Sequence, residues 1–130
     1  MNIEELIKDN GIKVKDIYNS SLGHGSFIAL CSDLKKRTED YIPIISIYKY
    51  LTKEERECVL SHEFGHFVHF YKTKLSWPEY IRVHYSSKRD RLKVEEFCWE
   101  YAEREFNYNE EYGCFNILME NSLKGYRGEI

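Results

Sequence analysis

The chain has 130 residues, of which 42% are hydrophobic, 15% aromatic and 32% charged, and its formal net charge is −3 at pH 7. This composition predicts one soluble globular domain over residues 1–130 and excludes a disordered chain. The balance is slightly acidic, and the basic runs at residues 35–37 and 86–91 are short. We therefore expect no direct binding to nucleic acid.

The N-terminus and the cysteines indicate where the protein works. The opening "MNIEELIKDNG" has no basic region followed by an apolar one, so it predicts no signal peptide. No apolar run is long enough to span a membrane. The four cysteines form no C-x-x-C pair, which favours reduced thiols in a cytoplasmic protein. Cys58 and Cys98 fall within helical apolar patterns and are predicted core residues.

The first half of the chain predicts a short helix followed by strands. Residues 2–10 form an amphipathic pattern that ends at an Asn-Gly pair, as a short helix does. Residues 12–18 fit either a strand or a second short helix. Residues 23–31 and 40–51 are apolar, with glycines before the first segment and β-branched residues in the second, and both predict strands. Pro43 places the latter strand at or near a sheet edge.

A long helix is predicted from about residue 53 to 71. Thr52 and Glu55 have the spacing of a capping box, in which each side chain binds the backbone N–H of the other residue. The segment that follows, residues 72–92, is broken at a Trp-Pro pair and predicts a loop, alone or with a short strand at residues 80–85.

The rest of the chain is predicted to be mostly helical. A second long helix is expected from about residue 89 to 106, and a short helix at residues 115–123. Residues 124–130 are expected to be a frayed tail. This order of elements predicts an α+β fold with a small β-sheet packed against helices.

The segment "VLSHEFGHFVHF" (residues 59–70) contains three of the five histidines and an H-E-x-x-H motif at His62, Glu63 and His66. Residues four apart share one face of a helix, so both imidazoles can bind one ion, and imidazole nitrogen is a common ligand of zinc. Glu63 lies one step round the helix, where its carboxylate can act as a general base beside the metal's open position. We therefore expect one Zn²⁺ ion.

A catalytic zinc needs a third protein ligand, and several residues could supply it. His69 lies one helix turn beyond the motif and is expected to contact a ligand rather than the metal. His84 is a further candidate in the predicted loop, and His24, between two glycines, is expected to be a turn residue. On the second long helix, Glu95 adjoins the packed side, and Glu96 is the alternative.

A resemblance distinguishes between these carboxylates. "HEFGH", followed after 28 residues by "EEFCWEYA", resembles the ImmA/IrrE family of zinc-dependent metallopeptidases. In that family an H-E-[LIF]-G-H helix precedes a second helix with a pattern like E-x-x-A-N-x-F-A, whose glutamate is the third zinc ligand. The resemblance covers roughly residues 20–106 and implies a zincin-like site with Glu95 as that ligand. Trp99 stands where the family commonly has asparagine, and the L-L-M-P-like segment is missing.

The resemblance also implies a function. Members of the family cleave helix-turn-helix transcriptional repressors, often of phages and mobile elements, so a repressor is the implied protein partner. Between the two ligand-bearing helices, His84, Tyr85 and Tyr80 are candidates to stabilise the transition state. The alternatives are a non-catalytic zinc protein that binds a partner and a zinc hydrolase of small substrates. Glu63 favours catalysis over a structural site, because a structural zinc needs no general base.

Overall fold

The computed structural model describes residues 2–19, 23–30 and 41–128. Its helices and strands, in chain order, are α1 (Ile3–Asp9), β1 (Lys13–Ile17), β2 (Gly25–Leu30), β3 (Ile42–Tyr48), α2 (Lys53–Thr73), α3 (Trp77–His84), α4 (Lys88–Glu105), α5 (Tyr108–Glu111) and α6 (Cys114–Arg127). Cys31 and the basic run at residues 35–37 lie outside the described residues. None of the described helices is long and apolar enough to cross a membrane.

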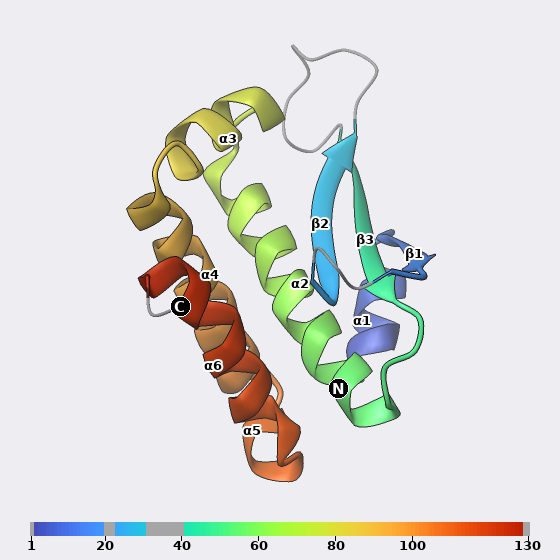
Figure 1. Cartoon of the computed structure of the whole chain (residues 1–130). Helices are drawn as coiled ribbons and strands as arrows, with labels where there is room; N and C mark the ends of the chain where they lie inside the picture. The colour runs from blue at the N-terminus through green and yellow to red at the C-terminus, as the bar shows by residue number, and fades with distance from the viewer. Residues whose placement is uncertain (1, 20–22, 31–40, 129–130) are drawn as a thin grey trace.

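The sheet has three strands in the order β1-β3-β2, with β1 parallel and β2 antiparallel to β3. Helix α2 packs against β2 and β3, and α4 and α6 cover the other side of α2 (Figure 1). The layers are therefore sheet, α2, and the α4–α6 pair. This arrangement confirms the predicted α+β fold with a small sheet packed against helices, and residues 12–18 contribute a strand rather than a helix.

Strand β3 is the central strand of the sheet, but at the Pro43 position it has a neighbour on one side only, as an edge position has. Pro43 lies opposite Ala29 of β2, whereas the pairing of β3 with β1 begins only at Ile44. Proline lacks a backbone N–H and therefore fits the end of a strand where one neighbour is missing. The preference of proline for edge positions therefore predicted the surroundings of Pro43 itself but not the central position of the rest of β3.

Helix α2 begins at the predicted capping box. The backbone N–H of Glu55 donates to Thr52 Oγ1 at 3.1 Å, and the backbone N–H of Thr52 donates to Glu55 Oε1 at 2.9 Å. The middle of the helix is buried on all sides, from Glu57 to His66, because α2 lies between the sheet and the other helices. Its polar residues in that stretch are consequently removed from solvent.

The predicted loop at residues 72–92 was wrong, because the structure has helix α3 there. Ser76 caps the helix by accepting the N–H of Glu79 at 3.4 Å, and Pro78 lies in the first turn. Proline is tolerated at that position because the first N–H groups of a helix have no partner within it. Tyr80 is fully buried against Phe70 of α2, and this contact stabilises the short helix.

The C-terminal prediction was right about a helix but wrong about its end. Helix α6 continues to Arg127, so residues 124–127 are helical and not a tail, and Gly128 ends it in the left-handed conformation at φ 76°. Arg127 pairs with Glu96 of α4 at 3.7 Å. Cys58 and Cys98 are core residues, as predicted.

Candidate metal centre

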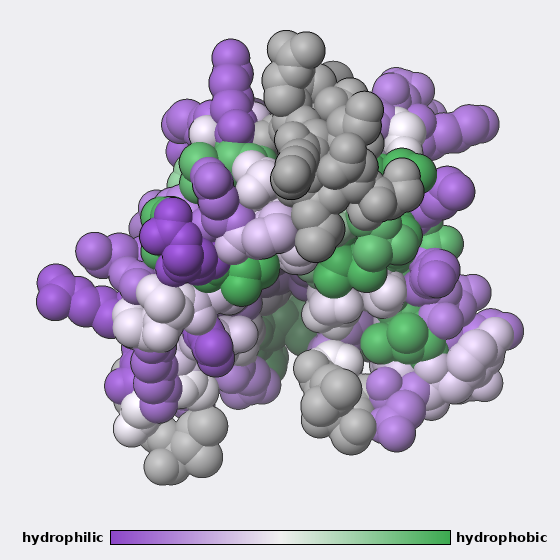
Figure 2. All heavy atoms as spheres, turned by 90° about the horizontal axis from the view of Figure 1, so that it is seen from above, coloured by the Kyte–Doolittle hydropathy of each residue, from purple (hydrophilic) through white to green (hydrophobic). Residues whose placement is uncertain are grey.

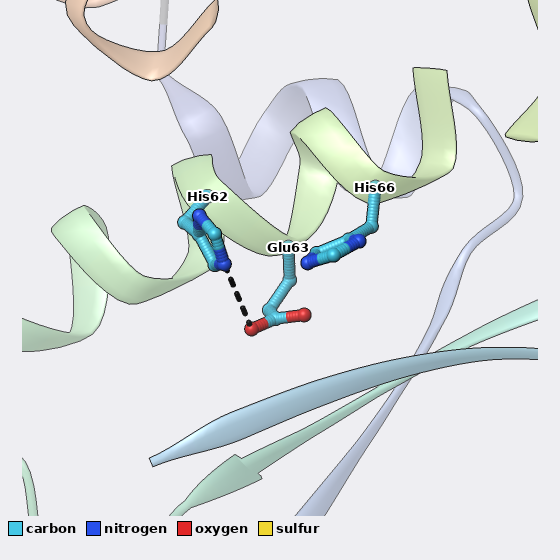
Figure 3. Close-up of side chains that lie close together, drawn as sticks. All are labelled: His62, Glu63 and His66. Atoms are coloured by element: carbon cyan, nitrogen blue, oxygen red, sulfur yellow. Dashed lines mark ion pairs between the residues drawn. The ribbon is translucent and has the colours of Figure 1, made fainter. Parts of the chain in front are cut away.

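Three side chains from the middle of α2 and one from α4 form the centre. His62, Glu63 and His66 lie on one side of α2 (Figure 3), and Glu95 reaches them from α4. All four are buried, and Glu95 is only 7% exposed. Buried charged and polar groups on facing helices are costly unless they have partners, so this cluster is a candidate functional site.

The Glu95 carboxylate faces both imidazoles. Its Oε2 lies 2.6 Å from His66 Nε2, and its Oε1 lies 3.4 Å from His62 Nε2. Glu63 Oε2 lies 4.0 Å from His62 Nε2 (Figure 3). Burial raises the pKa of Glu95, but His66 and His62 outweigh that effect and hold it well below its usual range. Glu95 is therefore an anion held between two imidazole nitrogens.

These residues fit a metal ion. Two groups of side chains could hold one, each with its ligand atoms within 4.8 Å of one another: His62, Glu63 and His66, and His66, Glu95 and Cys98. Two imidazole nitrogens with a carboxylate form a ligand set that divalent transition metals accept. His62 Nδ1, which is not the nitrogen that faces Glu95, is buried and has no hydrogen-bond partner among the described residues.

Glu95 and Glu96, which the sequence left as alternative ligands, have different surroundings in the structure. Glu95 is buried and lies with the histidines. Glu96 is partly exposed and pairs with Arg127 of α6. Neighbouring residues on a helix point about 100° apart, so only one of the two can face α2.

Cys98 is a site residue that the sequence analysis placed only in the core. It lies one turn after Glu95 on the same face of α4, close enough to His66 and Glu95 to share a cation with them. Burial raises the pKa of the Cys98 thiol to about 11, although His66 lowers it. Cys98 follows Glu95 by three residues, and this spacing, which puts both on one helix face, could have predicted its place in the site.

The residues predicted to stabilise the transition state contact His66 and His69. The Tyr85 hydroxyl is hydrogen-bonded to His66 Nδ1 at 3.2 Å, which leaves Nε2 facing Glu95. The Tyr80 hydroxyl is hydrogen-bonded to His69 Nδ1 at 2.8 Å, and the His84 ring lies 4.8 Å from that of His69. His69 thus belongs to this outer group and is in neither of the metal-binding groups.

Trp99 shapes the centre from the side of α4. Its indole stacks on the His62 ring, with centroids 4.2 Å apart and an interplanar angle of 24°. The indole Nε1 is buried without a partner among the described residues. A histidine ligand is usually oriented by a hydrogen bond to its second ring nitrogen. His62 Nδ1 has no such bond among the described residues, and the stack with Trp99 positions the ring instead.

A cavity of about 350 Å³ opens over the centre, between α6 and the start of β2. Figure 2 shows a hollow between the side of the molecule that carries α6 and the side that carries the sheet. The lining residues are Gly23, His24, Gly25, Val59, His62, Glu63, Glu95, Trp99, Leu118, Asn121, Ser122 and Tyr126. Tyr80, His84 and Tyr85 do not line it.

Gly25, the first residue of β2, and His24 before it form part of the cavity lining. A Cβ on Gly25 would lie 2.8 Å from Val59 Cγ1 and 3.2 Å from Glu63 Oε2, so glycine lets the strand approach the glutamate closely. His24, which was expected to be a turn residue, lies at a bend just before β2; its carbonyl accepts the N–H of Tyr48 of β3 at 2.8 Å, and the residue also lines the cavity.

Comparisons of the chain with family models, curated proteins and solved structures give no match. The function is therefore inferred from the residues of the centre and the cavity above them.

Proposed function

We propose that the chain is a zinc-dependent endopeptidase with a zincin-like site, in which His62, His66 and Glu95 hold one Zn²⁺ ion. The main support is the position of the Glu95 carboxylate between the two Nε2 atoms, at 2.6 and 3.4 Å, whereas Glu63 Oε2 lies farther away, 4.0 Å from His62 Nε2. Two histidines and one glutamate, with one position open, form a common ligand set of catalytic zinc. Magnesium and calcium favour oxygen ligands instead.

Glu63 is the proposed general base. Zinc bound at the centre would polarise a peptide carbonyl and lower the pKa of a water molecule towards about 7. Burial raises the pKa of Glu63, against the lowering effects of His62 and His66. A carboxylate with a raised pKa accepts a proton more readily, so Glu63 takes the proton of the attacking water and returns it to the leaving amine.

The proposed substrate is a polypeptide. The cavity is open at the surface and runs between β2 and α6, with Glu63 in its lining. The resemblance of "HEFGH" and Glu95 to the ImmA/IrrE family supports a cytoplasmic helix-turn-helix repressor as the partner. A partner-binding protein without catalysis is the competing proposal. With Glu95 as the third ligand, Glu63 lies outside the ligand set, and this favours catalysis because a structural site has no use for an additional buried carboxylate.

The test is the substitution Glu63→Gln, which keeps the size of the side chain but removes the base. We expect the variant to hold zinc and fold as the wild type does, and to cleave a mixed-sequence peptide pool about 10²–10⁴-fold more slowly. Glu54→Gln, at an exposed position in the first turn of α2, is the matched control. Equal cleavage by Glu63→Gln, or a wild type without zinc after reconstitution, would contradict the proposal.

A further inference from the structure

Helix α6 presents one face to the cavity. Leu118, Ser122 and Tyr126 are spaced four residues apart, so they share that face, and all three line the cavity with Glu63 and Glu95. Tyr126 is in the last turn of the helix, in a segment whose sequence predicted only a tail. The helix therefore brings a phenolic hydroxyl to the wall of the candidate metal centre.

The last turn of α6 is joined to α4 by an ion pair and is closed by its own C-cap. Arg127, the residue after Tyr126, pairs with Glu96 of α4 at 3.7 Å and with Glu120 of α6 at 3.6 Å. The N–H of Gly128 donates to the carbonyl of Lys124 and closes the helix. Because Glu96 is the neighbour of Glu95 in sequence, this ion pair links the last turn of α6, which carries Tyr126, to the part of α4 that carries the proposed ligand.

A phenol has an ordinary pKa of about 10, so the Tyr126 hydroxyl carries a proton at neutral pH without any help from its surroundings. Burial raises the pKa of Tyr126, and the charges of Glu95 and Glu63 raise it further, while His66 and Arg91 lower it. The groups that act on this hydroxyl thus include Glu95, His66 and Glu63. A phenol that keeps its proton can donate a hydrogen bond, which is what a developing oxyanion requires.

The tyrosines predicted for this task are engaged elsewhere. The Tyr85 hydroxyl is bonded to His66 Nδ1, the Tyr80 hydroxyl is bonded to His69, and neither residue lines the cavity. Among the tyrosines of the described residues, Tyr126 is the one in the cavity lining.

We propose that Tyr126 is a catalytic residue that donates a hydrogen bond from Oη to the carbonyl oxygen of the scissile peptide bond as that oxygen becomes negatively charged. The inference rests on the proposed endopeptidase function. In this step the water oxygen bonds to the carbonyl carbon, the π electrons of C=O move to the oxygen, and the water proton passes to Glu63. Tyr126 keeps its own proton throughout.

The experiment compares the zinc-reconstituted wild type with Tyr126→Phe and Tyr50→Phe. Tyr50 is exposed and outside the cavity lining, so its variant removes a matched hydroxyl elsewhere. The substrate is the peptide that the wild type cleaves fastest in a mixed-sequence pool. We expect kcat to fall about 10²-fold in Tyr126→Phe, with KM and zinc content unchanged, and no change in Tyr50→Phe.

A binding measurement tests whether the Tyr126 hydroxyl stabilises the transition state more than the bound substrate. A phosphonate analogue of the same peptide carries a tetrahedral anion at the cleavage position. We expect Tyr126→Phe to bind it about 10–100-fold more weakly than the wild type does, by calorimetry. In a Glu63→Gln background the uncleaved peptide should bind equally with and without the Tyr126 hydroxyl.

The outcomes distinguish this inference from the function on which it rests. If the wild type cleaves peptides and Tyr126→Phe has the same kcat, the role of Tyr126 is wrong and the endopeptidase stands. If only KM rises, or if zinc is lost, Tyr126 binds substrate or supports the metal and is not the donor. If Ser122→Ala shows the kcat loss and Tyr126→Phe does not, Ser122 is the donor. A zinc-loaded wild type that cleaves nothing overturns both proposals.

Discussion

Gly65 of α2 lies directly against Cys98 of α4. A Cβ built on Gly65 would stand 2.9 Å from Cys98 Cα and 3.0 Å from its carbonyl oxygen. Both neighbouring atoms belong to the backbone of a helix and cannot move away alone. The two helices therefore reach this separation only with glycine, next to His66 on one helix and one turn after Glu95 on the other.

Gly65→Ala is expected to destabilise the protein and to weaken zinc binding. Alanine favours a helix over glycine by about 1 kcal/mol, but an extra methyl group in a packed core costs about 1–3 kcal/mol. Because the clash is with backbone, we expect the cost of the methyl group to lie in the upper part of that range. The net loss in the free energy of unfolding, measured with urea, is then about 1–2 kcal/mol. Gly113→Ala is the control, since nothing lies within 4 Å of a Cβ there. Equal stability of Gly65→Ala and wild type would contradict the close contact.

Glu95→Ala is expected to lose most of the bound zinc, and Glu96→Ala to keep it. Glu95 lies 2.6 Å from His66 Nε2, whereas Glu96 is paired at the surface with Arg127. Removing one of the three proposed ligands should lower the affinity strongly, while an exposed ion pair contributes about 0–1 kcal/mol to stability. Elemental analysis of the purified proteins measures the metal content. Zinc retained in Glu95→Ala would shift the third ligand to another residue.

Cobalt spectroscopy tests whether Cys98 is a ligand in place of His62 or in addition to it. Cys98 is near His66 and Glu95 but does not line the cavity. The proposed ligands are nitrogen and oxygen, so we expect the Co²⁺-substituted protein to lack the near-ultraviolet charge-transfer band of a cobalt thiolate. Cys98→Ser should leave the spectrum unchanged. A band that disappears in Cys98→Ser would make the sulfur a ligand.

The sequence predicted well what depends on local spacing. The capping box of Thr52 and Glu55 determines the start of α2, and the four-residue spacing of His62 and His66 puts both on one helix face. These two signals depend on residues within one or two helix turns, so no tertiary information was needed. The apolar residues of α4 placed Glu95 beside the packed side but left Glu96 as the alternative, and the family resemblance was needed to choose Glu95.

The parts that the sequence missed depend on contacts between distant segments. Pro78 fits both a break and a first helical turn, and the burial of Tyr80 against Phe70 favours the helix. Helix α6 extends to Arg127 with support from its pairing with Glu96 of α4. That extension places Tyr126 on the cavity, which local propensity did not indicate.

Tyr85→Phe is expected to weaken zinc binding without unfolding the protein. The Tyr85 hydroxyl is hydrogen-bonded to His66 Nδ1 and so orients Nε2 towards Glu95. Loss of such a partner of a histidine ligand lowers metal affinity about 10–100-fold. Competition with a chromophoric chelator measures the affinity. Tyr71→Phe, which loses a hydroxyl bonded to the Tyr41 carbonyl away from the centre, is the control. The same affinity in Tyr85→Phe and wild type would show that the bond has no effect.

The metal-free protein is expected to lose stability as the pH falls from about 6.5 to about 4, in part through His69. Burial lowers the pKa of His69 to about 4, with further lowering by His84, His66 and Lys72. The unfolded chain then binds a proton at about 6.5 that the folded protein does not accept until about 4, so unfolding is favoured within this window and stability rises with pH across it.

His69→Gln should flatten that dependence. Glutamine cannot be protonated, and its amide oxygen can still accept the Tyr80 hydroxyl that now bonds to His69 Nδ1. Urea unfolding of both proteins in a chelator, at pH values from 4 to 7, gives the difference. A single proton changes stability by at most about 1.4 kcal/mol per pH unit, and we expect less because His69 is partly exposed and its charge is screened. Parallel curves for the two proteins would mean that His69 titrates alike in the folded and unfolded states.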